Sequence, residues 1–307
     1  MKKILVTGGS GMVGNALKTI IPDATFLSSK QVNLINQKET MDFFMHEQPT
    51  HVIHLAARVG GIKANMENLG DFYYENTMIN TNVLESSRVC GVDKVLSMLS
   101  TCVYPSDCEL PLKESMIHIG PPHESNYGYA YSKRMLDIQS RTYRQQYGCN
   151  FVSVVSNNLF GEHDNFHLTD SHVIPALIRK IYEAKNGGPQ VVLWGDGSPL
   201  REFTYSRDLA KILVFLMDTY DSPVPINIGN TKEYSIKQIA NMICNILQYD
   251  GTIMWDTKQP MGQYRKPSDN SNLKKLGWNN YTNFDEALEK TCNWFVENYH
   301  NAKGVRL

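Results

Sequence analysis

Tyr129 and Lys133, in the stretch NYGYAYSKRM, are of types and at a spacing that could carry acid–base chemistry. On a helix, residues four apart lie on one face. A lysine ammonium beside a phenol stabilises the phenolate and lowers a pKa that starts near ~10, so that tyrosine can exchange a proton at neutral pH. The spacing alone is a weak indication, because Tyr299 and Lys303 share it near the end of the chain.

The residues that precede this helix make the pair more informative. An apolar run in KVLSMLSTCVYPSD ends in Ser100, Thr101 and Cys102. A hydroxyl at Ser100 could hydrogen-bond the same substrate oxygen as Tyr129. Cys102 has two interpretations, since free cysteine is also among the most buried residue types.

A glycine loop near the N-terminus predicts a phosphate site. An apolar strand over residues 2–7 runs into GGSGMVG, in which Gly8, Gly11 and Gly14 stand three apart before a helix. Glycine allows the tight turn and a close approach of the backbone to a pyrophosphate, which the helix N-terminus attracts. We therefore expect the backbone of Ser10, Met12 and Val13 to contact the phosphates of a dinucleotide.

The end of the next strand favours NADP over NAD. Enzymes that use NAD place an acidic residue about 20 residues after the glycines, on the ribose hydroxyls. Here the corresponding stretch reads FLSSKQVN, with no acid. Lys30 and two serines suit a 2′-phosphate, although a lysine exposed on a turn would give the same pattern.

The elements that position these residues alternate between strand and helix through the first half of the chain. Strands are predicted at 2–7, 24–27, 51–57, 94–100 and 151–156, and helices at 14–21, 38–48, 68–90 and 127–147. This alternation indicates a Rossmann-like, doubly wound α/β fold with a parallel sheet, which binds ligands beyond the carboxyl ends of its strands.

The second half predicts a smaller mixed α/β lobe that binds substrate. We expect helices at 171–185, 235–248 and 284–299 and a strand at 190–194. The helix at 206–219 is predicted to return to the first lobe. The nucleotide-binding domain then covers 1–161 and roughly 203–220, and the substrate domain covers 162–202 and 221–307.

Composition excludes several classes of function. The net charge is −1 over 307 residues, which gives no general attraction to nucleic acid or to anionic membranes. Six cysteines are scattered without metal-like spacing, so we expect reduced thiols and no metal site. No signal-peptide core and no run of 18 apolar residues is present, which favours a cytoplasmic location.

Taken together, the motifs resemble the extended short-chain dehydrogenases/reductases, and within them the GDP-L-fucose synthase family. The resemblance covers essentially the whole chain. Two departures are Ser10, where some members carry arginine, and Glu162, where proline is more usual. The stretches that carry the resemblance, besides the glycine loop, Ser100 and the Tyr129–Lys133 pair, are LAARVGGIKAN (55–65), STCVYP (100–105), GEHDNFH (161–167), SHVIPALIRK (171–180), VLWGDGSPLREF (192–203) and RKP (265–267).

The resemblance implies three chemical steps at one site. A GDP-4-keto-6-deoxymannose would be epimerised at carbons 3 and 5 and then reduced at carbon 4 by NADPH. Tyr129, Lys133 and Ser100 would serve the reduction. Because one tyrosine cannot reach both faces of the sugar ring, Cys102 and His172 would supply the acid–base pair for epimerisation. His172 lies in TDSHVIP, near a helix start that Asp170 or Ser171 is expected to cap.

The resemblance also predicts the binding residues and a homodimer. The helices around 68–90 and 127–147 would form the dimer interface. Further cofactor contacts are expected from Ala56, Ala57, Asn157 and Leu159. Substrate contacts are expected from Asn158, His172, Val173, Lys180, Trp194, Arg201, Arg265 and Lys266.

Three alternatives remain at this point. A sugar-nucleotide 4,6-dehydratase would carry an Asp–Glu pair after the serine, where this chain has Thr101 and Cys102. A simple 4-epimerase would not need Cys102 and His172 as a pair. A regulator that only binds the cofactor would be expected to lack Tyr129 or Lys133.

Overall fold

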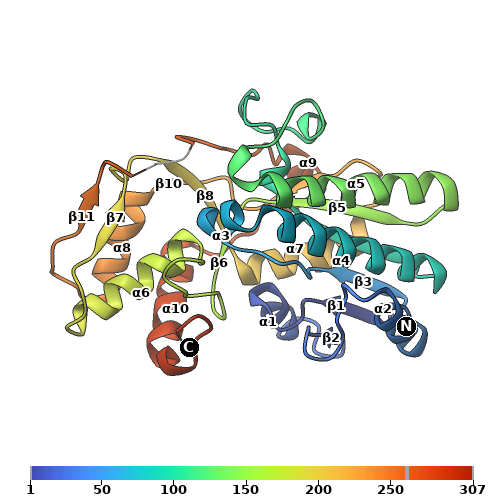
Figure 1. The fold of residues 1–307 in the computed structure, drawn as a ribbon, viewed down its shortest axis with the longest axis horizontal. Coiled ribbons are helices and arrows are strands. Elements are labelled where there is room, and N and C mark those ends of the chain that lie inside the picture. Colours follow the sequence, from blue (N-terminus) through green and yellow to red (C-terminus); the bar gives the residue numbers. More distant parts are fainter. Residues whose placement is uncertain (1, 260–262, 306–307) are drawn as a thin grey trace.

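A six-stranded parallel sheet forms the centre of the molecule (Figure 1). The computed structural model describes residues 2–259 and 263–305. The strand order is β2-β1-β3-β4-β5-β9, and the chain winds outward from β1 to β2 before it returns past β1 to β3. Ligands of such sheets bind at this reversal, beyond the carboxyl ends of the strands. The strands are β1 (Ile4–Thr7), β2 (Thr25–Leu27), β3 (His51–His54), β4 (Lys94–Ser100), β5 (Phe151–Ser156) and β9 (Ile226–Ile228).

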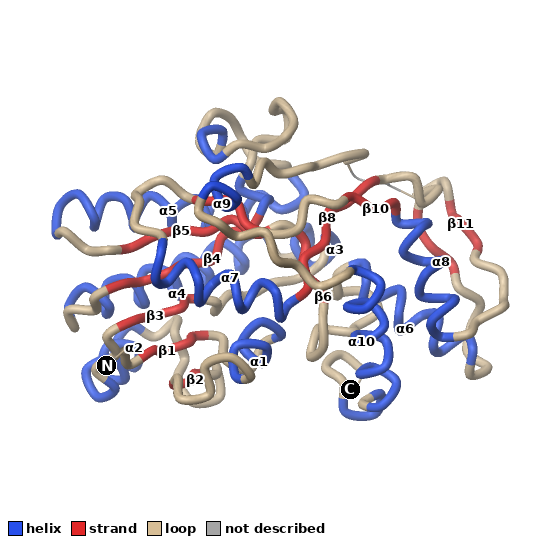
Figure 2. Tube along the Cα trace, turned by 180° about the vertical axis from the view of Figure 1, so that it is seen from behind, coloured by secondary structure: helices blue, strands red, loops and turns tan. Residues whose placement is uncertain are grey.

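Helices cover both faces of this sheet because its strands are apolar on both sides. Leu5 and Val95 pack into one buried cluster, and their neighbours Val6 and Leu96 pack into another on the opposite face. The first cluster includes side chains of α2 (Gln37–Glu47), α4 (Leu69–Val89) and α5 (Tyr127–Tyr147). The second includes α1 (Met12–Lys18), α7 (Ser206–Thr219) and α9 (Ser271–Lys275), and Figure 2 shows α7 and α9 on the face turned away in Figure 1. The predicted doubly wound fold is confirmed, and α7 packs on the main sheet.

A second, separate core lies beside the carboxyl ends of the main sheet. It joins apolar side chains such as Phe160, Ile178, Phe203, Ile243 and Phe295. Its two small sheets have the orders β10-β8-β6 and β11-β7. The elements are β6 (Asn158–Phe160), β7 (Val192–Trp194), β8 (Leu200–Tyr205), β10 (Glu233–Ser235), β11 (Met254–Asp256), α6 (Val173–Lys185), α8 (Ile236–Leu247) and α10 (Phe284–Glu297).

The domain boundaries expected from the sequence need two corrections. Residues 226–228, assigned to the substrate domain, form β9 at the edge of the main sheet, where Ile226 and Ile228 are fully buried. Residues 158–160, assigned to the first domain, form β6 and place Phe160 in the second core. Three-residue strands are too short for a hydrophobic period to assign them.

Two element predictions also differ from the structure. The strand predicted at 51–57 ends at His54, and the residues after it leave the sheet as a loop. A short helix, α3 (Ile62–Glu67), precedes α4 and was not predicted. None of the helices in the described part of the chain is long and apolar enough to cross a membrane.

Replacing Gly14 by alanine should destabilise the fold, because α1 lies against the turn after β1. A Cβ at Gly14 would stand 2.7 Å from the backbone of Gly8 and Gly9. Overpacking of this kind costs about 1–3 kcal/mol, which should lower the urea midpoint of unfolding. Gly70→Ala in α4 is the control: nothing lies within 4 Å of its added Cβ, and alanine stabilises an exposed helix by about 1 kcal/mol. Equal midpoints for the two variants would contradict the close packing of α1.

Candidate active site

The glycine loop between β1 and α1 is shaped to receive a phosphate. Gly8 adopts a positive φ of 72°. It lies so close to the loop after β3 that a Cβ added to Gly8 would stand 2.9 Å from the backbone nitrogen of Ala56. Gly11 is the N-cap of α1, with no side-chain cap and no acidic residue in the first turn. The first amides of the helix, at Met12 and Val13, are therefore free of side-chain competitors for an anion. This cradle fits the pyrophosphate of a dinucleotide, and Ser10 is exposed beside it.

The end of β2 offers a cation in place of the acid that NAD enzymes use. Gly9 donates its amide to the carbonyl of Leu27, which brings the end of β2 beside the glycine loop. Lys30 is exposed and forms no ion pair within the described residues. The Ser28 hydroxyl donates to Gln31 at 2.8 Å. A 2′-phosphate would meet a lysine and hydroxyls here, with no carboxylate to repel it.

Lys133 connects α5 to the end of β4. Its ammonium is buried, donates to the carbonyl oxygen of Met98 at 2.9 Å, and lies 5.8 Å from the ring centre of Tyr129. Burial lowers the pKa of Lys133 to about 8. Ser100 ends the same strand, so the serine, the tyrosine and the lysine meet at the carboxyl edge of the sheet.

The expected depression of the tyrosine pKa is wrong for this structure. Burial raises the pKa of Tyr129 above that of a free phenol, and the charge of Cys102 acts in the same direction. No hydrogen bond joins the hydroxyl of Tyr129 to Lys133 among the described residues. Tyr129 is therefore a neutral phenol at physiological pH, the form that can donate a proton to a developing alkoxide.

A buried polar network behind Lys133 was missed by the sequence analysis. His54 is completely buried, with Nδ1 2.8 Å from the hydroxyl of Thr7 and Nε2 3.0 Å from Oδ1 of Asn80. Asn80 in turn donates its amide to the carbonyl of Ser132 in α5. Burial lowers the pKa of His54 to about 3, so the ring is neutral. The network joins β1, β3 and α4 to α5, the helix that carries Tyr129 and Lys133.

Cys102 lies in a single 3-10 turn, Thr101–Val103, directly after Ser100. The thiol is 8% exposed, and the backbone amide of Cys102 donates to the Ser100 hydroxyl at 3.5 Å. Burial raises the pKa of the thiol, while the ammonium groups of Lys266 and Lys133 lower it. The structure thus brings Ser100, Cys102, Tyr129 and Lys133 together.

His172 lies on a different element. It is the exposed N-cap residue of α6, and no side chain caps that helix, so the expected cap by Asp170 or Ser171 is wrong. The amide of Gly61 donates to the carbonyl of Asp170 at 3.1 Å, which joins the loop before His172 to the loop after β3. No hydrogen bond joins His172 and Cys102 among the described residues, and their pairing in catalysis stays a prediction.

Asp164 is a buried acid beside this histidine that the sequence analysis did not single out. It is 5% exposed, accepts a hydrogen bond from the amide of Asn165 at 2.7 Å, and has no partner for Oδ2 in the described part of the chain. Burial raises its pKa to about 6, against the opposing influence of His172. The motif GEHDNFH contained it, but a carboxylate in a loop gives no sign of its burial.

The residues expected to bind substrate divide into two groups. Arg265 pairs with Glu233, with Nε 2.9 and 2.8 Å from the two carboxylate oxygens, so its guanidinium has an anionic partner in this structure and its phosphate contact stays a prediction. Lys266 and Arg201 form no ion pair among the described residues, and burial lowers the pKa of both. Trp194 is 59% exposed at the end of β7, which excludes the core position considered from the sequence.

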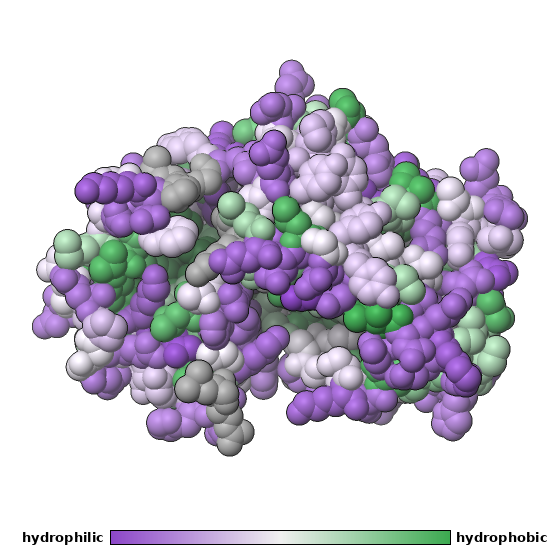
Figure 3. Space-filling view, viewed as in Figure 1, coloured by the Kyte–Doolittle hydropathy of each residue, from purple (hydrophilic) through white to green (hydrophobic). Residues whose placement is uncertain are grey.

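The remaining predicted positions follow strands of the main sheet or lie on elements of the second core. Asn158 donates its side-chain amide to the carbonyl of Glu202, and Lys180 donates to the carbonyl of Val192. Asn157 is buried between Glu202 and Thr204. Partly buried positions that could present backbone or apolar contacts to a ligand are Ala56, Ala57, Leu159 and Val173. Figure 3 shows the surface hollowed between the parts of the molecule that contain α1 and α10.

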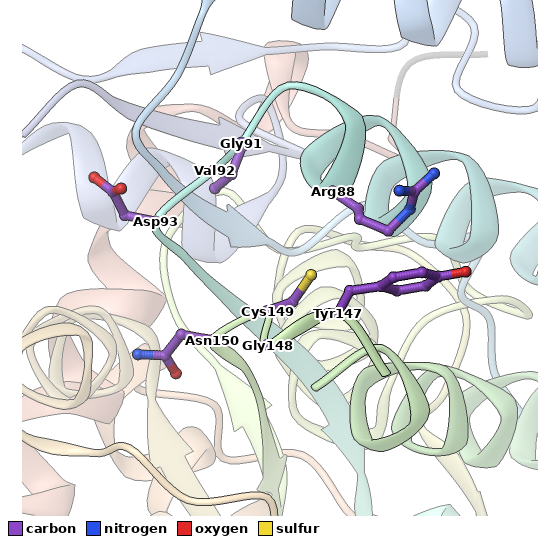
Figure 4. Close-up of a pocket in the computed structure, with 8 residues that line it drawn as sticks. All are labelled: Arg88, Gly91, Val92, Asp93, Tyr147, Gly148, Cys149 and Asn150. Carbon is purple, nitrogen blue, oxygen red and sulfur yellow. The ribbon is translucent and has the colours of Figure 1, made fainter. Parts of the chain in front are cut away.

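Another hollow lies at the opposite end of the main sheet and is separate from these residues (Figure 4). It is bounded by the segments that precede β4 and β5, including Asp93 and Asn150, and by Arg88, which stacks on Tyr147. Ser100 stands seven residues beyond Asp93, or about 23 Å at the rise of an extended strand. The described residues contain no group of three or more side chains suited to hold a metal ion.

A glycine loop at the start of a doubly wound sheet, with serine, tyrosine and lysine at its carboxyl edge, defines a dinucleotide-binding protein of the short-chain dehydrogenase/reductase class. The profile of the NAD dependent epimerase/dehydratase family matches residues 4–229, and the chain belongs to this family.

The similar proteins share a common description. The chain is 42% identical to a GDP-L-fucose synthase of Dictyostelium discoideum over 98% of each chain. It is 39% identical to a probable GDP-L-fucose synthase of Drosophila melanogaster, over 99% of this chain and 100% of that one. A GDP-L-fucose synthetase from Naegleria fowleri, solved bound to NADP, superposes with a TM-score of 0.93 at 40% identity, over 98% of this chain and 95% of that one.

Asp164→Asn should become more stable than the wild type as the pH rises. The Asp164 carboxyl has a pKa of about 6 in the folded protein and about 4 in the unfolded chain. As the pH rises from 4 to 6, the unfolded state ionises first, and the free energy of unfolding of the wild type therefore falls. The asparagine does not titrate. Its free energy of unfolding relative to the wild type should therefore rise by up to about 3 kcal/mol across this window in urea titrations.

The exposed acid after α8 provides the control for this measurement. Asp250→Asn should shift stability by the same small amount at every pH, because Asp250 is exposed. A pH-independent difference for Asp164→Asn as well would contradict the buried, neutralisable carboxyl described here.

Proposed function

We propose that this protein converts GDP-4-keto-6-deoxy-D-mannose into GDP-L-fucose, by epimerisation at carbons 3 and 5 followed by NADPH-dependent reduction at carbon 4. The observation that carries the proposal is the position of Cys102, a buried thiol in the same edge of the sheet as Ser100, Tyr129 and Lys133. A reductase needs only the last three. Full-length similarity to GDP-L-fucose synthases supports the same conclusion.

The reductive step uses the serine, the tyrosine and the lysine. NADPH, when bound on the glycine loop, supplies a hydride to the ketone carbon. Tyr129, kept neutral by burial, donates its proton to the ketone oxygen as charge develops there. The Ser100 hydroxyl donates a hydrogen bond to the same oxygen, and the ammonium of Lys133 stabilises the phenolate that remains.

Epimerisation uses Cys102 and His172. A carbon next to a ketone loses a proton more easily because the resulting charge moves onto the carbonyl oxygen, where Tyr129 and Ser100 donate hydrogen bonds. Cys102, on the sheet edge, would remove the proton from one face. His172, at the start of α6, would return a proton from the other face, since imidazole is a common general acid and base in enzymes.

The nucleotide end of the substrate would lie against the second core. Arg201 and Lys266 present two cations without carboxylate partners in the described chain, which suits a diphosphate. Exposed Trp194 offers an apolar ring against which the base or ribose could pack. Asn158 and Lys180 lie on elements that border the same junction.

We infer that the protein is a homodimer that pairs α4 and α5 with the same helices of a second copy. These two helices pack against each other and expose large apolar side chains, among them Tyr74 at 59% and Ile138 at 39%. Other exposed members of this face are Tyr73, Tyr127 and Met135. A concentration of exposed apolar side chains on two packed helices is typical of an interaction surface.

A reducing, cytoplasmic location fits the proposed chemistry. All six cysteines are unpaired in the structure, and Cys102 must remain a thiol to exchange protons.

The test is to mix the purified protein with GDP-4-keto-6-deoxy-D-mannose and follow NADPH by absorbance, with NADH in parallel, before identifying the sugar formed. NADPH loss with GDP-L-fucose as product supports the proposal. An unepimerised 6-deoxy sugar would leave only a reductase and return Cys102 to a structural role. No consumption would favour the 4-epimerase or the cofactor-binding regulator.

Cys102→Ala should separate the two activities. Loss of a general base costs about 10²–10⁴-fold, so incorporation of solvent deuterium at the sugar carbons should fall at least 100-fold. NADPH affinity, measured by fluorescence, should not change. Cys108→Ala, which removes a half-buried loop thiol, should retain normal incorporation. Normal incorporation in Cys102→Ala would rule out the assigned base.

The dimer is tested by a charge on the exposed face of α5. Ile138→Glu should place carboxylates in the interface and shift sedimentation velocity from dimer to monomer. Met45→Glu on α2, where methionine is 51% exposed outside the proposed interface, should remain dimeric. A dimeric Ile138→Glu variant would place the interface elsewhere.

A further inference from the structure

Phe72, in the first turn of α4, packs its ring against that of Tyr129. Its side chain is 3% exposed, and the two ring centres lie 6.4 Å apart at an interplanar angle of 81°. Aromatic rings favour this edge-to-face arrangement, because the positive edge of one ring meets the negative face of the other. The contact therefore fixes the direction of the Tyr129 ring as well as its distance from α4.

The backbones of α4 and α5 are in contact beside these two rings. A Cβ on Gly128, the residue before Tyr129, would stand 2.2 Å from the carbonyl oxygen of Leu69. Only glycine allows so close an approach, which leaves no space for the first turn of α5 to move toward α4. Phe72 therefore meets Tyr129 across a fixed distance between the helices.

The loop after β3 supports the ring of Phe72 through Arg58. The guanidinium carbon of Arg58 lies 4.9 Å from the centre of this ring, a cation–π contact, and its Nη1 atom is 2.6 Å from the carboxylate of Glu75. The buried side chain of Asn76 accepts a hydrogen bond from the amide of Arg58 at 2.9 Å and donates to its carbonyl at 3.0 Å. It also donates to the carbonyl of Phe72 at 2.7 Å. Asn76 thus ties the backbone of Arg58 to that of Phe72.

Gly60, in the same loop, lies against the ring of Phe72. A Cβ added to Gly60 would stand 3.2 Å from Cζ of Phe72, so there is no free space between the loop and the ring. Gly61 donates its amide to the carbonyl of Asp170 at 3.1 Å, which anchors the loop on the segment before α6. The loop is therefore held on both sides of Gly60, and Phe72 has little room to turn away from Tyr129.

We propose that Phe72 is a positioning residue that holds the phenol of Tyr129 in the direction needed for proton donation, with Arg58, Asn76 and Gly60 keeping Phe72 in place. The inference rests on the proposed function, in which Tyr129 protonates the ketone oxygen. A residue that only fills the core would contribute through its volume. The role proposed here depends on a flat ring edge, so replacing that edge by an aliphatic side chain should reduce the reaction rate in addition to stability.

The first measurement compares the kinetics of Phe72→Leu with those of Phe44→Leu. Phe44 is the matched control, because it is also buried and lies edge-to-face with Phe43 at 6.4 Å and 77°, on α2, where no site residue is predicted. Both variants should lower the urea midpoint of unfolding. Only Phe72→Leu should lower kcat for the keto sugar, by about 10- to 100-fold with KM unchanged, because a displaced proton donor weakens the transition state alone. An unchanged kcat in Phe72→Leu, or an equal loss in Phe44→Leu, would overturn the proposal.

A double-mutant cycle determines whether the effect of Phe72 passes through the phenol. In a Tyr129→Phe background the proton donor is already absent, so Phe72→Leu should reduce the remaining kcat no further. Losses that multiply would show that Phe72 acts independently of Tyr129, and the proposal would be wrong.

The second measurement needs no substrate. In protein labelled with 3-fluorotyrosine, the fluorine signal of Tyr129 is identified by its absence from Tyr129→Phe. A ring that is held firmly gives two fluorine signals, one for each side of the ring, whereas a ring that turns freely gives one average. The two signals expected for the wild type and for Phe44→Leu should merge in Phe72→Leu. The same signals in Phe72→Leu as in the wild type would contradict the proposal.

These measurements separate the inference from the proposed function. If the wild type does not turn over the keto sugar, the proposed function fails, and the fluorine signals alone decide whether Phe72 holds the phenol. If the wild type does turn it over, a normal kcat in Phe72→Leu overturns the role of Phe72 and leaves the proposed function intact. Phe72→Met, which also lacks the flat ring, repeats both measurements should Phe72→Leu fail to fold.

Discussion

The hydrogen bond from the ammonium of Lys133 to the carbonyl of Met98 is the contact on which the arrangement of the site depends. It joins the first turns of α5 to the last residues of β4, in an interior where neither group has access to water. Ser100 and Cys102 follow Met98 by two and four residues, and Tyr129 precedes Lys133 by one helical turn. A displacement of α5 relative to β4 would therefore move the phenol away from both the serine and the thiol.

Polar groups buried around this contact keep the elements in register. His54 faces Oδ1 of Asn80, an atom that can only accept, so Nε2 carries the ring proton and Nδ1 accepts the hydroxyl hydrogen of Thr7. Each ring nitrogen of the neutral His54 imidazole therefore has a hydrogen-bond partner. A charged imidazole there would repel Lys133. On the other side of the site, Glu202 performs a similar function for Asn157 and Ser268. Apolar residues would pack as densely, but they would not fix the relative positions of these elements as directional hydrogen bonds do.

The sequence was sufficient for the sheet, the covering helices and the glycine loop, because long apolar runs and glycine spacing are local signals. It was insufficient where pairing partners are distant. The three-residue β9 depends on contact with β5, and the commitment of Arg265 to Glu233 depends on a neighbouring strand of the second core. The burial of Asp164 and the raised pKa of Tyr129 are likewise consequences of packing. Side-chain type identified these groups as titratable, but only the surroundings set their protonation.

The proposed chemistry places opposite demands on two groups that share one environment. Tyr129 must be protonated to donate to the ketone oxygen, whereas Cys102 must lose its proton to act as a base. Burial alone raises the pKa of both, which suits the phenol and opposes the thiolate. A selective positive charge is therefore required near sulfur. The ammonium groups of Lys266 and Lys133 both oppose the effect of burial on the pKa of Cys102, and neither is among the groups that shift the pKa of Tyr129. A cation placed in this way can favour the thiolate while it leaves the phenol protonated, so that one buried site can support both proton removal from carbon and proton donation to oxygen.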